Sequence, residues 1–333
     1  MDKQYSEDSR QFVPETMSNM RFAVLVLGHG EMGRSMEHLL SGRHALTFWE
    51  RNLEDGSENI PLEQAAAQKD FVIFALPALP HAELAERIQA HISDHCICLS
   101  IAKGMDEQGR TPAAVLGGVL GPAGRFGMIY GPMIAEEVRA GHPGFAELGT
   151  TQSDVYERTR ELFAGAPLYL RHNTDVIGVS WAVILKNVYV PLLGAAEEAG
   201  LGDNARGFLA TAALEEMARI IESRGGRRET AYSLAGLGDL VTTATSTGSH
   251  HRQVGRDLVH CAPGDTCGTG MNVHSEGIHS LNMVQRFGLL DLESFPLLRL
   301  VRDIVNEPRD VAAKFRPFLD ASFADAASRN TRD

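Results

Sequence analysis

The feature that most constrains the fold is a short apolar run that leads directly into a glycine-rich turn. Residues 22–27 read FAVLVL, the spacing GxGxxG follows over 28–33, and residues 34–42 (RSMEHLLSG) have a helix-like pattern. A continuous apolar run of this length is typical of a strand buried on both faces of a parallel sheet. Strand, tight turn and helix in this order predict a dinucleotide-binding unit.

Each glycine of the turn has an expected task. Gly28 permits the tight turn, Gly30 lets the backbone approach a pyrophosphate, and Gly33 lets the helix pack close to the strand. The amino end of the helix offers free N–H groups and the positive end of its dipole to phosphates. We therefore predict that a dinucleotide binds at Gly28, His29, Gly30, Glu31, Met32 and Gly33.

The end of the second apolar run bears on the choice of cofactor. Residues 44–49 (HALTFW) are followed by Glu50, 22 residues after Gly28, and then by Arg51. A carboxylate at this place accepts hydrogen bonds from the adenosine ribose of NAD, whereas an arginine pairs with the 2′-phosphate of NADP. Charged residues are also common at strand ends without any ligand. The sequence therefore predicts NAD or NADP and does not choose between them.

Further apolar runs recur at intervals that leave room for helices. They cover residues 71–76, 97–101 and 126–130, with helical patterns such as 82–92 (AELAERIQAHI) between them. Alternating strands and helices predict an α/β domain with a doubly wound parallel sheet of the Rossmann type. Lys103 follows one of these runs, at the edge of the sheet where ligands bind.

The second half of the chain nearly loses the strand signal. Residues 205–223 are amphipathic at helical spacing, and residues 275–287 and 294–306 read as further helices. A chain of 333 residues is long enough for two domains. We expect a flexible extension, a dinucleotide-binding domain, an all-α substrate domain and a flexible tail, at residues 1–19, 20–174, 175–320 and 321–333 respectively.

A single lysine lies inside an apolar segment at the start of the helical half. Residues 176–196 read VIGVSWAVILKNVYVPLLGAA, and Lys186 is the only charged residue between Asp175 and Glu197. Burial of an unpaired ammonium group is costly, and it lowers the pKa toward the range useful for proton transfer. A catalytic lysine is one interpretation, while a structural ion pair and a side chain that reaches the surface are the alternatives.

Composition limits the kinds of function. A net charge of −12 argues against a general nucleic-acid binder, and 44% hydrophobic with 22% charged residues is typical of a soluble globular protein. Residues 176–196 are long enough to span a bilayer, but Lys186, Asn187 and Pro191 near the centre argue against a membrane span. Four cysteines without a CxxC pattern predict no metal site and a reduced, cytoplasmic chain.

A second glycine-rich turn, in the helical half, carries an aspartate. Residues 236–243 read GLGDLVTT, and such a turn is suited to aiming the carboxylate of Asp239 inward, where its most useful partner is Lys186. The alternative is an aspartate that caps the next helix. Residues 249–252 (SHHR) form a polar cluster without the carboxylate–histidine spacing that would indicate a metal.

Taken in order, these segments resemble one enzyme family. The GxGxxG turn, IAKG, GPxxAEEV, DVIGV, LKNV, GLGDN, GLGDL and SEG are similar to the motifs of bacterial-type NAD(P)-dependent glycerol-3-phosphate dehydrogenases, over nearly all of residues 21–308. The resemblance implies a Rossmann domain and a helical domain with the site between them. It also implies interconversion of dihydroxyacetone phosphate and glycerol 3-phosphate with NAD or NADP, a reaction that commonly supplies phospholipid synthesis.

The resemblance further implies a set of site residues. Lys186 falls on the proton-transferring lysine, Lys103 on the lysine that contacts substrate and cofactor, and Asp239 on their acidic partner. The other implied substrate-binding residues are Gly131, Asn187, Thr243, Ser249, His250 and His251. The implied cofactor-binding residues outside the glycine turn and the Glu50–Arg51 pair are Lys103, Ala135, His250 and Glu276.

The chain departs from the family pattern in places. The family's Ser-Arg-Asn reads Ser-His-His over 249–251, so that His250 replaces the arginine that grips the substrate phosphate. Met133 replaces a substrate-contacting serine, and Met32 replaces an aromatic residue in the glycine turn. Arginine offers phosphate a permanent charge and a bidentate fork, whereas histidine offers one or two hydrogen bonds. Arg252 is expected to compensate if its loop shifts.

Three hypotheses for the function follow. Lys186, Lys103 and Asp239 favour a glycerol-3-phosphate dehydrogenase, which acts on a small phosphorylated triose or glycerol substrate. His250, His251 and Met133 suggest, as an alternative, a divergent dehydrogenase of another small hydroxy compound. The third hypothesis is a non-catalytic nucleotide-binding protein. A homodimer is left open.

Overall fold

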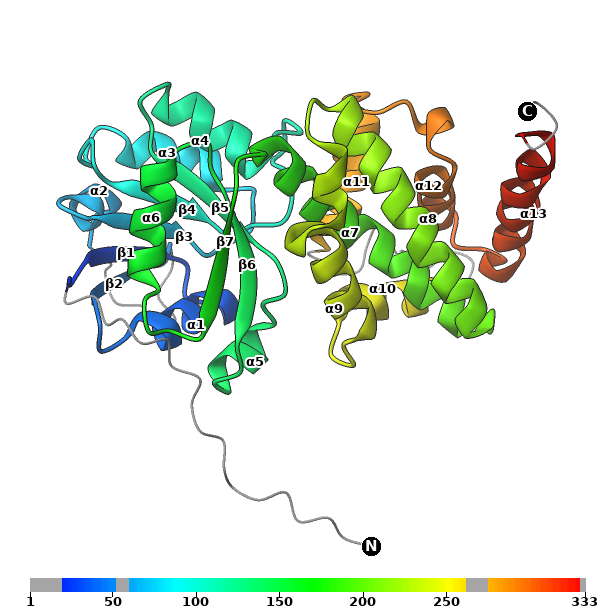
Figure 1. Ribbon diagram of the computed structural model, residues 1–333, viewed down its shortest axis with the longest axis horizontal. Helices are drawn as coiled ribbons and strands as arrows, with labels where there is room; N and C mark the ends of the chain where they lie inside the picture. The colour runs from blue at the N-terminus through cyan, green and yellow to red at the C-terminus, as the bar shows by residue number, and fades with distance from the viewer. Residues whose placement is uncertain (1–19, 52–59, 262–274, 330–333) are drawn as a thin grey trace, which may run out of the picture.

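The structure is a computed structural model in which residues 20–51, 60–261 and 275–329 are described. An α/β domain formed by the first half of the chain lies beside a helical domain formed by the second half (Figure 1). The fold class predicted from the sequence is thereby confirmed. The extension predicted over 1–19 lies outside the described residues.

One sheet organises the first domain, with strand order β2-β1-β3-β4-β5-β6-β7. The five predicted apolar runs form its parallel strands: β1 (Ala23–Leu27), β2 (Ala45–Trp49), β3 (Phe71–Phe74), β4 (Ile97–Ser100) and β5 (Phe126–Tyr130). All residues of β3 and β4 are buried, as expected for central strands covered on both faces.

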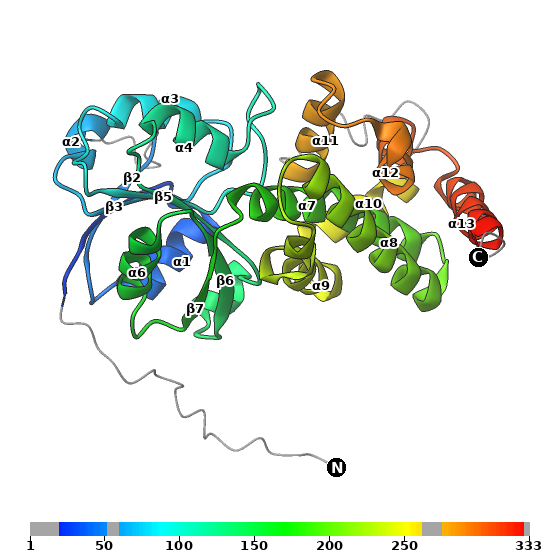
Figure 2. The ribbon, with the colours of Figure 1, turned by 45° about the horizontal axis from the view of Figure 1, so that its top comes forward.

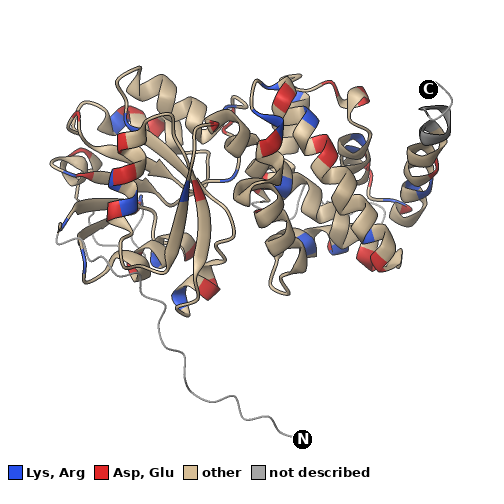
Figure 3. Cartoon of the chain, in the orientation of Figure 1, with Lys and Arg blue, Asp and Glu red and all other residues tan. Residues whose placement is uncertain are grey.

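Helices cover both faces of this sheet. In Figure 2, one face carries α2 (Leu62–Ala66), α3 (His81–Ile88) and α4 (Pro112–Leu120), and the other carries α1 (Glu31–Leu40) and α6 (Ser153–Leu162). A short helix, α5 (Ala135–Arg139), packs against α1. Most charged residues lie on helices and loops of the two domains (Figure 3).

Two strands of the sheet were not predicted from the sequence. They are β6 (Gly144–Gly149) and β7 (Leu168–Asn173), and β6 runs antiparallel to β5, so the sheet is mostly rather than wholly parallel. Their sequences, GFAELG and LYLRHN, lack the continuous apolar run of the other strands. Glu147 in β6 is buried and accepts a hydrogen bond from Ser233 Oγ at 2.6 Å, which compensates part of the cost of its burial.

The second domain is built around α7 (Val176–Glu198), which is buried from Gly178 to Ala196. Its other helices are α8 (Gly202–Ser223), α9 (Asp239–Thr245), α10 (His250–Val259), α11 (Glu276–Arg286), α12 (Pro296–Asn306) and α13 (Val311–Arg329), with short helical turns at Arg228–Tyr232, Leu234–Gly238 and Leu292–Ser294. Helix α13 covers residues 321–329, where the sequence predicted part of a flexible tail, and the domain bounds remain a prediction.

Helix α7 is the core of its domain. Among the described residues it is the one helix long and apolar enough to cross a membrane, and 89% of its most apolar window is buried inside the protein. This burial explains its composition, because a helix that is apolar all round needs an apolar surrounding on every side. The surrounding is supplied mainly by α8, α10 and α11.

Glycines bring the neighbouring helices into backbone contact with α7. A Cβ atom on Gly194 would overlap the carbonyl oxygen of Arg252, and one on Gly255 would overlap that of Pro191. A Cβ atom on Gly277 would likewise overlap the carbonyl oxygen of Asn187. The amino-terminal parts of α10 and α11 are therefore held against the segment of α7 that carries Lys186.

The cysteines differ from the expectation of a fully reduced chain. Cys96 and Cys98 are buried free thiols beside or within β4, and burial contributes to raising the pKa of Cys98 after its hydrogen bond with Cys96. Cys261, just after α10, is disulfide-bonded. The prediction of reduced cysteines was therefore wrong at this position.

Candidate active site

The glycine-rich turn between β1 and α1 fits a bound dinucleotide. Gly28 has a φ of +89°, and a Cβ atom there would lie 2.8 Å from the carbonyl oxygen of Ala75. A Cβ atom on Gly33 would overlap the carbonyl oxygen of Gly28, so α1 packs directly on the turn. A Cβ atom on Gly30 would meet nothing within 4 Å. The turn thus leaves open space beside the amino end of α1, where a pyrophosphate is favoured.

The residues expected to choose between NAD and NADP have different environments. The backbone N–H of His29 donates to Glu50 Oε1 at 3.1 Å, which places this carboxylate at the turn. Arg51 instead pairs with Glu83 on α3 at 2.5 Å, with both side chains about half exposed. Glu50 therefore lies where a ribose hydroxyl is expected, while Arg51 is engaged by a neighbouring helix.

The remaining residues expected near this turn link α1 to α5. Glu31 begins α1 and pairs with Arg139 of α5 at 2.5 Å, and the carbonyl of Ala135 accepts a hydrogen bond from Ser35 Oγ at 3.2 Å. Met32 is partly buried and packs against the core of the sheet. These contacts keep the turn and the start of α5 together at one edge of the sheet.

Three ionisable side chains from distant segments meet at the junction of the domains. Lys103 follows β4, Lys186 lies in the middle of α7, and Asp239 begins α9. Asp239 Oδ2 lies 2.9 Å from Lys103 Nζ and 3.1 Å from Lys186 Nζ. The Asp239 and Lys186 side chains are 4% and 3% exposed, whereas that of Lys103 is 19% exposed. Asp239 thus binds the lysines rather than capping a helix.

Burial and charge shift the pKa values of this cluster in different directions. Burial lowers the pKa of Lys186 to about 8, although Asp239 opposes the shift and Lys103 adds to it. For Asp239, burial acts to raise the pKa, but the ammonium groups of Lys103 and Lys186 outweigh it and leave the pKa below its usual value. The cluster therefore holds a carboxylate and a lysine able to gain or lose a proton near neutral pH.

Asn187 and Thr243 complete the surroundings of the lysines. Thr243 Oγ1 lies 3.0 Å from Lys186 Nζ and donates to the carbonyl of Asp239 at 2.7 Å, so it orients Lys186. Asn187 Nδ2 donates to the carbonyl of Lys103 at 3.2 Å, and thus holds the loop after β4. The buried Oδ1 atom of Asn187 has no protein hydrogen-bond partner among the described residues.

Glu276, the first residue of α11, lies beside the same loop. A Cβ atom on Gly104 would come 3.3 Å from the Cβ of Glu276, so the loop after β4 and the start of α11 are in contact. Burial raises the pKa of Glu276, while Lys103 and Lys186 oppose this shift. The side chain therefore responds to the same charges as Asp239.

The expected phosphate clamp forms the amino end of α10. Ser249 caps this helix by accepting a hydrogen bond from the N–H of Arg252 at 3.2 Å, and His250 is exposed. Burial, followed by the charges of Lys186, His250 and Lys103, lowers the pKa of His251 to about 3, so its imidazole is neutral at physiological pH. The buried Nδ1 atom of His251 has no hydrogen-bond partner among the described residues.

Arg252 does not replace the missing arginine of the clamp. Its Nε and Nη2 atoms donate to the carboxylate of Glu197 at 2.9 and 2.8 Å, and its side chain is 15% exposed. The expected compensation by Arg252 is therefore not seen. A guanidinium held by a bidentate carboxylate has few donors left for a second anion.

The other departure from the family pattern concerns the segment after β5. Met133 is buried within the core of the sheet domain. A Cβ atom on Gly131 would overlap the carbonyl oxygen of Phe145, so a glycine is needed for the close approach of β6. Met133 thus serves packing, while Gly131 keeps the backbone tight at the same edge of the sheet.

Comparison with known proteins agrees with this arrangement. Residues 54–155 match the N-terminal family of NAD-dependent glycerol-3-phosphate dehydrogenase, and residues 175–315 match its C-terminal family. The chain is 28% identical to a glycerol-3-phosphate dehydrogenase [NAD(P)+] of Sphingopyxis alaskensis, over 92% of this chain and 99% of that protein. It is 30% identical to one of Agrobacterium fabrum, over 90% of this chain and 97% of that protein.

A solved structure shows the same fold. Glycerol-3-phosphate dehydrogenase of Coxiella burnetii superposes with a TM-score of 0.77 at 24% identity, over 90% of this chain and 99% of that one. Fold, sequence and the junction between the domains together define a two-domain dehydrogenase that uses NAD or NADP. Within that class, the chain belongs to the glycerol-3-phosphate dehydrogenase family, and the family expected from the sequence is confirmed.

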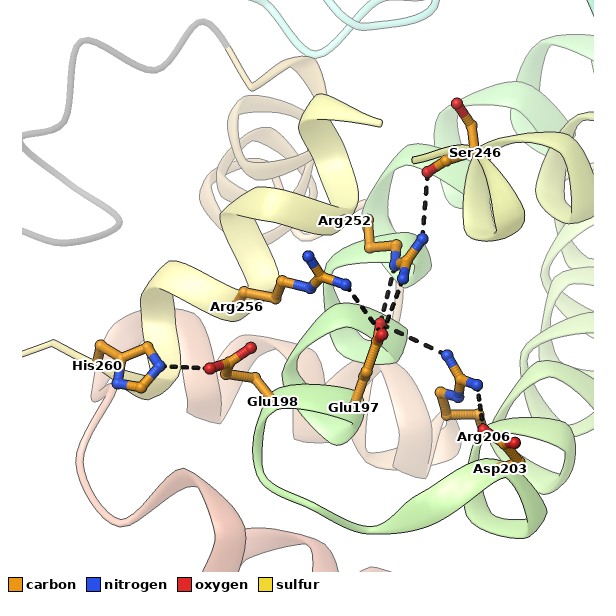
Figure 4. Close-up of polar contacts among 8 residues, drawn as sticks. All are labelled: Glu197, Glu198, Asp203, Arg206, Ser246, Arg252, Arg256 and His260. Atoms are coloured by element: carbon orange, nitrogen blue, oxygen red, sulfur yellow. Dashed lines mark hydrogen bonds and ion pairs between the residues drawn. The ribbon is translucent and has the colours of Figure 1, made fainter. Parts of the chain in front are cut away.

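Sequence reasoning missed one polar cluster beside the site. Glu197, at the end of α7, binds Arg252 and Arg256 of α10 and lies near Arg206 of α8 (Figure 4). The available signal was an acidic residue directly after a long apolar run. The partners follow 9 to 59 residues later in the chain, so spacing alone could not pair them.

Proposed function

We propose that the protein interconverts dihydroxyacetone phosphate and sn-glycerol 3-phosphate, with Lys186 as the general acid and base. The observation that carries this proposal is the buried cluster of Lys186, Asp239 and Lys103 at the domain junction. When bound at the glycine-rich turn, a nicotinamide cofactor supplies or accepts the hydride. Gly28, Gly30, the amino end of α1 and Glu50 support binding of such a cofactor.

Lys186 and Lys103 have different proposed roles at the reacting oxygen. In reduction, the Lys186 ammonium donates a proton to the carbonyl oxygen, and in oxidation its neutral amine accepts the hydroxyl proton. A pKa lowered to about 8 makes both forms accessible near neutral pH. Lys103, more exposed than Lys186, stabilises negative charge that develops on the oxygen. Asp239 and Thr243 hold the Lys186 ammonium in one direction.

The amino end of α10 is the proposed place of the substrate phosphate. The Ser-His-His segment over 249–251 lies there, and Ser249 fixes the first turn. Within the described ranges, the buried Nδ1 of His251 and Oδ1 of Asn187 have no hydrogen-bond partner, and a ligand or water would satisfy them. Because His251 is neutral, the phosphate is bound with less charge than an arginine would give.

We infer a preference for NAD over NADP. The support is the Glu50 carboxylate at the turn and the engagement of Arg51 by Glu83. A phosphate at the ribose 2′ position would approach Glu50, and like charges repel. We further propose a cytoplasmic enzyme that supplies glycerol 3-phosphate for phospholipid synthesis. Dimerisation remains a hypothesis, which analytical ultracentrifugation would test.

The experiment is to mix the purified protein with dihydroxyacetone phosphate and follow the absorbance of NADH and of NADPH separately. Oxidation of NADH or NADPH at micromolar to millimolar dihydroxyacetone phosphate, the usual Michaelis range, supports the proposal. The cofactor that is oxidised faster is the preferred one. Binding of cofactor without oxidation would contradict it.

A second candidate is a divergent dehydrogenase of another small hydroxy compound. The neutral His251 and the absence of an arginine in the segment 249–251 favour it. Dihydroxyacetone, which lacks the phosphate, separates the two candidates. If it is reduced with a kcat/KM equal to or above that of its phosphate, the second candidate is correct.

A further inference from the structure

The carboxylate of Glu197 lies at the centre of several arginine side chains (Figure 4). Arg252 donates to it from Nε at 2.9 Å and from Nη2 at 2.8 Å, and Arg256 donates from Nη2 at 2.9 Å. Arg206 of α8 lies 3.5 Å away. Hydrogen bonds from Arg252 lead the effects that lower the pKa of Glu197 to about 2, so it is charged throughout the neutral range. Arginines from two helices, α8 and α10, thus converge on one carboxylate of α7.

Arg252 connects this carboxylate to the residues at the start of α10. Its Nη1 atom also donates to the carbonyl of Ser246 at 3.2 Å, on the segment that enters α10. Its backbone N–H donates to Ser249 Oγ at 3.2 Å, which is the cap of the helix. Arg252, which Glu197 holds, directly follows His251 in the chain. Arg252 thus ties the cap of α10 and the segment that enters it to Glu197.

Steric contact alone does not determine this orientation. The glycine contacts at Gly194 and Gly255 set how closely α10 approaches α7. Close backbone packing limits the distance between two helices, whereas a bidentate pair of arginine and carboxylate also specifies direction. Glu197 is in the last turn of α7, the helix that carries Lys186. Glu197 thus connects the start of α10, the proposed phosphate site, to the helix that carries the proposed proton-transferring lysine.

We propose that Glu197 is a positioning residue for the substrate phosphate. It holds Arg252, and through it the first turn of α10, so that Ser249, His250 and His251 are presented to the substrate. The inference rests on the proposed function, since it takes dihydroxyacetone phosphate as the ligand. Glu197 touches neither Lys186 nor Asp239, so its removal should weaken substrate binding more than the chemical step.

The chain offers a matched control in the next residue. Glu198 pairs with His260 Nε2 at 2.6 Å, at the other end of α10 (Figure 4). The two glutamates have similar exposure, 28% for Glu197 and 32% for Glu198. Each therefore loses a partly exposed carboxylate contact, Glu197 to arginines of α10 and Glu198 to the residue that ends α10, on change to glutamine. Only the Glu197 pair adjoins the segment 249–251.

The test compares the steady-state kinetics of Glu197→Gln and Glu198→Gln with those of the unchanged enzyme. For Glu197→Gln we expect the KM for dihydroxyacetone phosphate to rise about tenfold, because small displacements of binding groups are costly, with kcat and the cofactor KM within about twofold. For Glu198→Gln we expect all three within about twofold. An unchanged substrate KM in Glu197→Gln, or an equal rise in the cofactor KM, would overturn the proposal. A lower substrate KM would also overturn it, since Glu197 would then only withhold Arg252 from the phosphate.

A double-mutant cycle tests the route through Arg252. Arg252→Gln should raise the substrate KM as much as Glu197→Gln, and the double variant should be no worse than either, because residues that act through one contact are not additive. Fully additive effects would contradict the route. If Glu197→Gln does not fold, Arg256→Gln removes one pair only and should raise the substrate KM about threefold; an unchanged KM there counts against the proposal.

A separate readout keeps this inference distinct from the proposed function. If the unchanged enzyme does not oxidise NADH or NADPH with dihydroxyacetone phosphate, the proposed function fails. Amide hydrogen exchange then tests positioning without substrate. The first turn of α10 should exchange at least fivefold faster in Glu197→Gln than in Glu198→Gln or the unchanged protein. Equal exchange in all three would refute the positioning role.

Discussion

The two ends of the active site differ in how their buried polar groups are satisfied. At the chemical end, Lys186, Lys103 and Asp239 neutralise and bond one another before any substrate binds. At the proposed phosphate end, His251 has a buried ring nitrogen without a hydrogen-bond partner in the described part of the chain, and His250 is exposed. Under the proposed function, the difference means that the groups for proton transfer are preorganised, while the phosphate is bound by groups with less charge.

The largest expected effect tests the chemical end. Lys186→Met keeps the length of the buried side chain and removes its proton, so kcat for reduction should fall about 10³-fold, within the usual range for general acid catalysis. The KM for dihydroxyacetone phosphate should change less than about threefold. Stopped-flow or steady-state assays measure both. Lys69→Met is the control, because Lys69 lies just before β3 and donates to Thr47 Oγ1 of β2 at 2.8 Å. A variant with normal kcat and only a raised KM would show that Lys186 binds rather than reacts.

The next prediction adds a permanent charge to the proposed phosphate end of the site. His250→Arg supplies the clamp with a permanent charge and a bidentate fork, so the KM for dihydroxyacetone phosphate should fall about 30-fold. His260→Arg adds the same group at the far end of α10 and should leave that KM unchanged. Assays with dihydroxyacetone as substrate should show no gain in either variant. An equal KM in His250→Arg and the unchanged enzyme would place the phosphate elsewhere.

A dependence on pH sharpens the assignment of Lys186. Because burial lowers its pKa to about 8, reduction, which needs the ammonium, should lose about tenfold in kcat/KM per pH unit above 8. Oxidation needs the neutral amine and should therefore rise through the same pH and level off above it. Profiles from pH 6 to 10 in both directions measure this. If kcat/KM falls with pH for both reduction and oxidation, or rises for both, Lys186 is not the group that serves as acid in one direction and base in the other.

The smallest effect concerns the cofactor. Glu50→Gln removes the carboxylate at the glycine-rich turn, so the KM for NADH should rise about fivefold and the KM for NADPH should fall, because like-charge repulsion is lost. Arg51→Gln serves as the matched control and should change either KM less than twofold, since Arg51 pairs with Glu83. If Arg51→Gln instead raises the KM for NADPH, Arg51 is the residue that determines the cofactor preference.

Much of the fold was predictable because its signals are local. The first strand, the glycine-rich turn and the buried helix around Lys186 each follow from a few adjacent residues. Strands β6 and β7 were missed because they carry polar residues that the tertiary structure satisfies, as Ser233 does for Glu147. Helix α10 was missed because its pattern of two histidines and an arginine reads as a polar loop.

The site was predictable in part. The pairing of Asp239 with Lys186 follows from the cost of burying either charge alone. The contact between Asn187 and the carbonyl of Lys103 could not be foreseen, because it depends on how the two domains meet. The same holds for Glu197 and its arginines, whose partners lie on separate helices.

The backbone contact between Gly255 of α10 and Pro191 of α7 has a consequence for how substrate choice can change. Since no side chain separates the helices there, this contact sets how closely the middle of α10 approaches α7, whichever residues occupy positions 249–251. Residues 249–251 can then be exchanged while Lys186 keeps its place five residues before Pro191. If the start of α10 binds the substrate phosphate as proposed, it is the place where a new substrate can be engineered without a change at Lys186.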